Sequence, residues 1–295
     1  MRGPLLSLLC GLLCPLLALD AQAASLQQQR LYYDEAKRAL SKGDAGPYQR
    51  YASALQDYPL EPYLAYDELT HRLKWASNDE IETFIADHGD LPQIGWMKLR
   101  WLRWLAERGE WQTFINYYDP KLNFTELDCL YGQYLFKHGM LKEGQAQAEK
   151  LYLVGKSQPE ACDVLFGLWR EHGGVNEQQR WQRAKLAAEA RNYGLASFLI
   201  KGLPTLGKQG EMLLQAAQNP NLLSQPSRFV PADRAMADAV GLGLRRLARQ
   251  DPEKALGLLD LYARQMAFSS DEKVAIAREI GLTLARRFDA RALKV

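Results

Sequence analysis

Residues 96–106 read WMKLRWLRWLA, and their apolar positions follow the period of an α-helix. One helical face has apolar residues at the i, i+4, i+7, i+8 spacing: Met97, Trp101, Trp104 and Leu105. A second apolar face consists of Leu99, Leu102 and Ala106. A surface helix needs only one buried stripe, so a helix that is apolar on two sides is expected between neighbours in a stacked array. This stretch predicts a helical solenoid.

Helix-ending signals recur along the chain on both sides of this stretch. Helical runs stop at Arg108-Gly109-Glu110, His138-Gly139-Met140, His172-Gly173-Gly174, Asn192-Tyr193-Gly194 and Gln250-Asp251-Pro252. The step from Gly109 to Gly139 is 30 residues and the step from Gly139 to Gly173 is 34 residues. These steps have the length of a two-helix repeat of the tetratricopeptide kind, so we expect consecutive helical hairpins.

The clearest hairpin is expected near the C-terminal end. Its first helix carries Met236, Val240, Leu244 and Leu247, and its second carries Ala255, Leu259, Tyr262 and Met266. Asp251 can cap the second helix and Pro252 can occupy its first position. A last helix, capped by Ser269, Ser270 or Asp271, is expected to bury Val274, Ala277, Ile280 and Leu284 on one face.

No segment shows sustained two-residue alternation with β-branched enrichment, so no sheet is expected. The predicted fold is all-α, an α-superhelix of stacked helical hairpins. The irregular residues 219–231, with three prolines, are expected to divide two sub-arrays.

Residues 1–23 have the features of a secretory signal peptide. Arg2 is followed by an apolar run over residues 5–19 and by Ala21-Gln22-Ala23, a small-x-small pattern. We place cleavage after Ala23, with Ala24 as the alternative. The apolar run is short and contains Pro15, so no stable membrane span is expected. The mature chain is predicted to be exported from the cytoplasm.

Two cysteines, Cys129 and Cys162, remain after the signal peptide is removed. An even pair in an oxidising compartment favours a disulfide, and the alternative is two buried free thiols. No metal is expected, because the four histidines and these cysteines lack ligand spacing. The histidines are His71, His88, His138 and His172.

Charge and motifs exclude several function classes. The net charge is +2 and the pI is 8.2, with basic and acidic residues interspersed, so no nucleic-acid partner is expected. No phosphate loop, nucleophile elbow or His-Glu-x-x-His motif occurs, so no catalytic residue and no cofactor are predicted. Solvent is expected to keep the side chains of four representative glutamates ionised. They are Glu61, Glu110, Glu126 and Glu160.

Tryptophans and cations are interleaved over residues 96–111. Such a pattern can stack on sugar rings or on bases, but its helical spacing favours core packing. The residues concerned are Trp96, Trp101, Trp104 and Trp111, with Lys98, Arg100 and Arg103.

Two runs carry a family resemblance. Residues 58–66, YPLEPYLAY, and residues 155–163, GKSQPEACD, closely resemble the superhelical N-terminal region of the soluble lytic murein transglycosylases of Gram-negative bacteria. The resemblance extends from about residue 26 to about residue 287 and places Cys129 and Cys162 where the family has a disulfide pair. It implies a superhelix that forms part of a ring.

In that family a lysozyme-like domain cleaves the β-1,4 bond between N-acetylmuramic acid and N-acetylglucosamine, forming a 1,6-anhydro sugar. The family's catalytic glutamate precedes a serine, and no Glu-Ser dipeptide occurs in this sequence. No catalytic residue is therefore carried over. Residues 24–295 are expected to form one non-catalytic α-superhelical domain, incomplete at its C-terminal end. Without a neighbour, the apolar face of the last helix around Ile276, Ile280 and Leu284 is expected to be partly exposed.

The resemblance implies two partners, the glycan strands of peptidoglycan through the parent enzyme and a catalytic domain, separate or lost. The alternative is a free-standing periplasmic helical-repeat scaffold that binds a protein or peptide on its concave face.

Overall fold

The computed structural model describes residues 25–294, and these residues are helical nearly throughout. Fifteen α-helices and five short 3-10 helices follow one another, and the described range contains no strand. The predicted all-α fold of stacked helical hairpins is confirmed. The expected signal peptide, residues 1–23 with cleavage after Ala23, lies outside the described residues.

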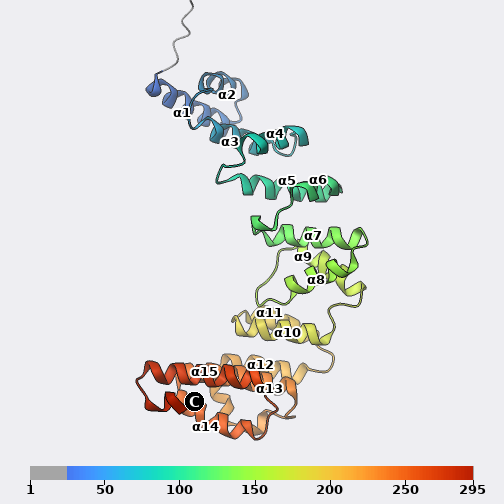
Figure 1. Ribbon diagram of the computed structural model, residues 1–295, viewed down its shortest axis with the longest axis vertical. Helices are drawn as coiled ribbons and strands as arrows, with labels where there is room; N and C mark the ends of the chain where they lie inside the picture. The colour runs from blue at the N-terminus through green and yellow to red at the C-terminus, as the bar shows by residue number, and fades with distance from the viewer. Residues whose placement is uncertain (1–24, 295) are drawn as a thin grey trace, which may run out of the picture. The chain divides into compact units, whose positions relative to one another are not determined.

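The chain divides into two compact units, Met1–Met97 and Lys98–Val295. The described part of the first unit holds four helices and the start of a fifth: α1 (Leu26–Lys42), α2 (Ala45–Ala52), α3 (Glu61–Arg72), α4 (Asn78–His88) and α5 (Ile94–Arg108). The second unit contains the rest of α5 and ten further helices (Figure 1). These are α6 (Trp111–Tyr117), α7 (Thr125–Lys137), α8 (Leu141–Tyr152), α9 (Ala161–Glu171), α10 (Glu177–Glu189), α11 (Tyr193–Lys201), α12 (Gly207–Gln218), α13 (Arg234–Gln250), α14 (Pro252–Ala263) and α15 (Ser270–Arg286).

In the first unit, α1 packs against α2 and α3. Ser25 begins α1 by accepting a hydrogen bond from the backbone N–H of Gln28 at 3.3 Å. Gly43, with φ at 74°, ends α1 in the left-handed conformation that glycine adopts without strain. A small core of Leu55 and Leu64 with several tyrosines lies beneath these helices.

Helix α5 is buried on both of its predicted apolar faces. Met97, Trp101, Leu105, Leu99 and Leu102 are all buried, and Trp104 is half-buried. The double stripe in residues 96–106 therefore marks an interior helix, as its sequence predicts.

Glycines end the helices where the sequence predicts. Gly109, Gly139 and Gly173 have φ angles of 74°, 76° and 84°, which any other residue adopts only with strain. The turn before α11 differs, because Arg191 takes the positive φ of 63° and Gly194 lies inside the helix. Asn192 caps α11 there by accepting a hydrogen bond from the backbone N–H of Leu195 at 3.2 Å.

Helix α13 is the centre of the main core. It packs against α12, α14 and α15, and its expected apolar residues are fully buried. Asp251 caps α14 by accepting from the backbone N–H of Lys254 at 3.0 Å, with Pro252 as the first residue of the helix. Ser269 caps α15 in the same way through the backbone N–H of Glu272 at 3.2 Å.

The sequence predicted that residues 219–231 divide two sub-arrays. In the structure they do not divide the array. Two 3-10 helices, Pro220–Ser224 and Pro226–Arg228, carry Leu223 into the core. The hydroxyl of Tyr262 donates a hydrogen bond to the carbonyl of Leu223 at 2.9 Å. Helices α12 and α13 on either side of the stretch pack on each other, and the first of the two 3-10 helices packs against both.

The expected partial exposure of the apolar face of the last helix is wrong, whereas the burial of Ile280 and Leu284 expected from the helical spacing is confirmed. Ile276, Ile280 and Leu284 are at most 1% exposed, because α15 packs against α13. Val274, expected on the buried face, is 66% exposed. Ile276 takes its place at the interface.

No helix within residues 25–294 combines the length and the apolar character needed to cross a bilayer.

Candidate functional site

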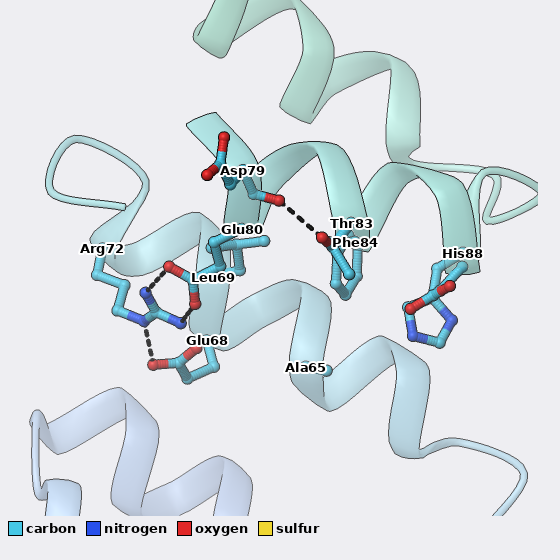
Figure 2. Close-up of a pocket in the computed structure, with 10 residues that line it drawn as sticks. Ala65, Glu68, Leu69, Arg72, Asp79, Glu80, Thr83, Phe84 and His88 are labelled. Atoms are coloured by element: carbon cyan, nitrogen blue, oxygen red, sulfur yellow. Dashed lines mark hydrogen bonds and ion pairs between the residues drawn. The ribbon is translucent and has the colours of Figure 1, made fainter. Parts of the chain in front are cut away.

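A pocket of about 430 Å³ lies in the first unit between α3 and α4 (Figure 2). Its wall is mostly charged, and Phe84 and Leu69 supply apolar surface. The rings of Phe84 and His88 lie 4.8 Å apart between centroids. The hydroxyl of Thr83 donates to the carbonyl of Asp79 at 2.7 Å, so it is held by its own helix.

Arg72 is the central cation of this pocket. Its Nε donates to Glu68 Oε1 at 2.6 Å, and its Nη1 donates to Glu80 Oε2 at 2.8 Å, with a second short contact between Nη2 and Glu80 Oε1 (Figure 2). The hydrogen bonds from Arg72 lower the pKa of the Glu80 carboxyl. The pair with Glu68 is readable from sequence as an i, i+4 contact. The pair with Glu80 could not be predicted from sequence, because it joins α3 to α4 and depends on how these helices pack.

A second pocket, of about 550 Å³, is bounded by α5, α6, α7 and α9. Arg103 donates two hydrogen bonds to Glu126, at 2.6 and 2.7 Å, and this pairing raises the pKa of the guanidinium. Glu160 lines the same pocket, so the fold brings together two glutamates that are distant in sequence. Glu61 and Glu110 lie elsewhere, at the start of α3 and before α6.

The tryptophans of residues 96–111 serve mainly in packing. Trp101 is fully buried, with its ring 4.9 Å from that of Tyr117. Trp111 lines the second pocket, but the ammonium of Lys137 lies over its ring at 4.8 Å. Trp96 is 60% exposed. The interleaved pattern is therefore no continuous stacking platform.

A third pocket, of about 710 Å³, borders α10 and the beginning of α13. Asp238 on its wall is buried and accepts a hydrogen bond from Trp181 Nε1 at 3.0 Å. Its other oxygen lies 3.2 Å from Arg234 and 3.4 Å from Lys185. These charges are matched within the wall, which is typical of a structural network.

One buried carboxyl, Glu272, was not anticipated from the sequence. It lies between α13 and α15, 8% exposed, with Oε1 3.4 Å from Arg245 Nε. Burial raises its pKa above the ordinary value, partly opposed by Arg245 and Lys185. No local signal distinguishes it, because its burial depends on which face of α15 meets α13.

Cys129 on α7 and Cys162 on α9 form a disulfide, and their Cα atoms lie 4.9 Å apart. Both cysteines are fully buried in a cluster that includes Phe136, Leu165 and Trp169. The bond therefore joins two helices that already pack together. No cluster of three potential metal ligands occurs among residues 25–294.

The structural class is an all-α array of helical hairpins with a disulfide between α7 and α9. No family model matches the chain. It is 29% identical over 253 residues to the soluble lytic murein transglycosylase of Escherichia coli K12, covering 85% of this chain and 39% of that protein. The Salmonella typhimurium protein of the same name is 28% identical over 257 residues, covering 87% and 40%.

Solved structures agree with this comparison. An inactive mutant of the lytic transglycosylase Slt from Pseudomonas aeruginosa superposes with a TM-score of 0.87 and 69% identity, over 89% of this chain and 43% of that one. Escherichia coli Slt70 gives a TM-score of 0.72 and 28% identity, over 88% and 42%. A further match is the 70-kDa soluble lytic transglycosylase in complex with bulgecin A.

The chain thus corresponds to the N-terminal region of the soluble lytic murein transglycosylases, and the predicted family is confirmed. It spans about two-fifths of the length of the relatives that it matches.

Proposed function

We propose that this chain is the non-catalytic superhelical part of a periplasmic lytic transglycosylase, holding peptidoglycan strands for a catalytic domain that cleaves them. The observation that carries this proposal is the 69% identity and TM-score of 0.87 to a lytic transglycosylase over 89% of the chain. The signal-like residues 1–23 support export to the periplasm, where peptidoglycan lies.

The side chains of the second pocket support a non-catalytic role. Cleavage of a glycosidic bond requires a carboxylic acid that stays protonated in a shielded cleft until it protonates the leaving oxygen. Glu126 instead accepts two hydrogen bonds from Arg103, so its carboxylate is one partner of an ion pair. Glu272, whose pKa is raised, is buried between two helices rather than placed beside an open cleft.

Digestion of murein tests the proposal. The chain is expressed with its N-terminal segment, recovered from the periplasm and incubated with murein sacculi, alongside a complete lytic transglycosylase as positive control. We expect sedimentation with the sacculi and no anhydro-muropeptides by mass spectrometry. N-terminal sequencing should begin at Ala24.

Two outcomes would contradict the proposal. Anhydro product that disappears in Glu126→Gln, Glu160→Gln or Glu272→Gln would show that the chain itself is catalytic. Failure to sediment with sacculi under any salt condition would remove the glycan-holding role and favour a scaffold for a protein partner.

A further inference from the structure

A groove of about 460 Å³ runs between α13 and α15 in the second unit. Its lining has four arginines against a single glutamate: Arg245, Arg249, Arg278, Arg286 and Glu279. Ala275 and Leu282 complete the wall. This local excess of cations contrasts with the whole chain, whose net charge is only +2. The groove therefore concentrates positive charge that the sequence as a whole does not display.

The cations line the groove because of helical spacing. Arg245 and Arg249 are four residues apart on α13. On α15 the lining residues occupy positions i, i+3, i+4, i+7 and i+11, which is one continuous face of a helix. Helices α13 and α15 lie side by side (Figure 1), so both rows border the same groove.

Two of the arginines are free to bind an external anion. Arg245 pairs with Glu189 at 2.6 Å, and Arg249 donates two hydrogen bonds to Glu279 at 2.7 and 3.0 Å. Arg278 and Arg286 are exposed, and neither makes an ion pair or side-chain hydrogen bond within the described chain. The unmatched charge of the groove therefore lies on α15.

The geometry favours carboxylates on a short chain. A guanidinium binds a carboxylate through two parallel hydrogen bonds, as Arg249 binds Glu279 in the wall of the groove itself. Arg278 and Arg286 are eight residues apart, or roughly 12 Å along the helix. An extended peptide advances about 3.3–3.6 Å per residue, so that distance corresponds to about four residues.

Between the two arginines the floor carries Glu279, which Arg249 binds, and Leu282, which supplies apolar surface. Leu282 is 44% exposed and lies one turn from each of them. Such a floor suits small aliphatic side chains between carboxylates better than a phosphodiester backbone. A separate pocket of about 180 Å³ shares Arg249 with the groove and is also lined by Arg191 and Arg246.

We infer that this groove binds the short, carboxylate-bearing peptides that branch from murein glycan. The inference rests on the proposed function, because it names the part of the murein that this region holds. Recognition is by the peptide carboxylates at Arg278 and Arg286, with the aliphatic side chains over Leu282. The sugar backbone makes no required contact in the groove.

The test is titration calorimetry on the full chain at low salt with three probes. These are a free murein tetrapeptide, a disaccharide-tetrapeptide and the uncharged sugar chitotetraose. We expect both peptide-bearing probes to bind, with affinity falling as salt is added, and chitotetraose to bind more weakly or not at all. The double variant Arg278→Gln/Arg286→Gln is expected to bind the peptides about tenfold more weakly, since each exposed pair contributes up to about 1 kcal/mol.

A matched control is Arg170→Gln/Arg264→Gln. It removes the same charge from exposed positions outside the groove and should bind as the unaltered chain does. Circular dichroism melting of all variants shows whether folding is kept. If the groove variant melts early, Leu282→Gln, which changes the exposed floor without changing charge, should still weaken peptide binding.

Three results would overturn the inference. One is equal affinity of the groove variant and its control for the peptides. Another is a stronger response to inorganic phosphate or to an oligonucleotide than to the tetrapeptide, which would mark a general anion site. The third is binding of chitotetraose as tight as that of the disaccharide-tetrapeptide, which would place recognition on the sugar and leave the proposed function intact. Loss of all sedimentation with sacculi would instead show that the proposed function fails.

Discussion

At the scale of single residues, charge pairing separates groups that hold the fold from groups that remain open to a ligand. Arg72 is held by Glu68 and Glu80, and Arg103 is held by Glu126. Arg278 has no such partner among the described residues. The guanidinium groups of Arg72 and Arg103 are thus already paired with carboxylates, whereas those of Arg278 and Arg286 on α15 are not, within the described part of the chain.

The pair between Arg72 and Glu80 predicts a pH dependence of stability. The folded-state pKa of Glu80 is lowered, so its stabilising effect is present above the unfolded pKa of about 4.3 and is lost as the pH falls through the folded value. Glu80→Gln is expected to lower the free energy of unfolding at pH 7 by about 0.2–1 kcal/mol, because the pair is partly exposed.

Urea unfolding of both proteins from pH 7 down to pH 3 measures this effect. The difference between the two curves should shrink toward zero in acid and in high salt. Glu82→Gln on the same helix is the control, since Glu82 forms no ion pair within the described range. A difference that stays constant across the pH range would show that Glu80 acts through packing instead.

At the scale of helices, close approach depends on small residues at the contacts. A Cβ on Gly210 of α12 would lie 2.5 Å from Ile200 Cγ2 and 2.9 Å from Ile200 Cγ1. Ile200 is stiff because it branches at Cβ and is itself buried in α11. A Cβ added to Gly257 of α14 would have no neighbouring atom within 4 Å. Two glycines inside helices therefore have opposite roles.

Alanine substitution distinguishes them. Gly210→Ala is expected to lower the free energy of unfolding by about 1–3 kcal/mol, because the added methyl overpacks the contact between α11 and α12. Gly257→Ala is expected to raise it by about 0.5–1 kcal/mol, because alanine is the better helix former. Thermal melting of the two variants measures both shifts. Equal effects of the same sign would refute a packing role for Gly210.

At the scale of the whole molecule, the disulfide limits how far the unfolded chain expands. Cys129 and Cys162 close a loop of 33 residues. In the chain-entropy model, this lowers the conformational entropy of the unfolded state and contributes about 3–4 kcal/mol to stability. The folded contacts between α7 and α9 do not depend on the bond, because a buried apolar cluster also holds these helices.

Reduction should therefore lower the melting temperature without loss of helical content below the transition. The measurement compares oxidised and reduced protein by circular dichroism, with mass spectrometry of unreduced tryptic peptides to show the link. The variant Cys129→Ala/Cys162→Ala should not respond to reductant. Two titratable thiols in periplasmic protein, or an unchanged melting temperature on reduction, would contradict the prediction.

Helix identity, most helix ends and the all-α class follow from local sequence, because period, caps and left-handed glycines act within a few residues. The double apolar stripe in residues 96–106 and the cap at Asp251 are examples. The family was also predicted from the sequence, through residues 58–66 and 155–163. None of these features requires knowledge of which helices become neighbours.

The tertiary structure alone decided which face of each helix meets a partner. Val274 and Ile276 are both apolar, yet only Ile276 is buried, since α13 contacts that side of α15. The same packing buries Glu272 and brings the arginines of α13 and α15 to one groove. Contacts between α12 and α13 keep residues 219–231 inside the second unit, which begins after Met97. These features depend on contacts between residues far apart in the chain, whose partners no local pattern specifies.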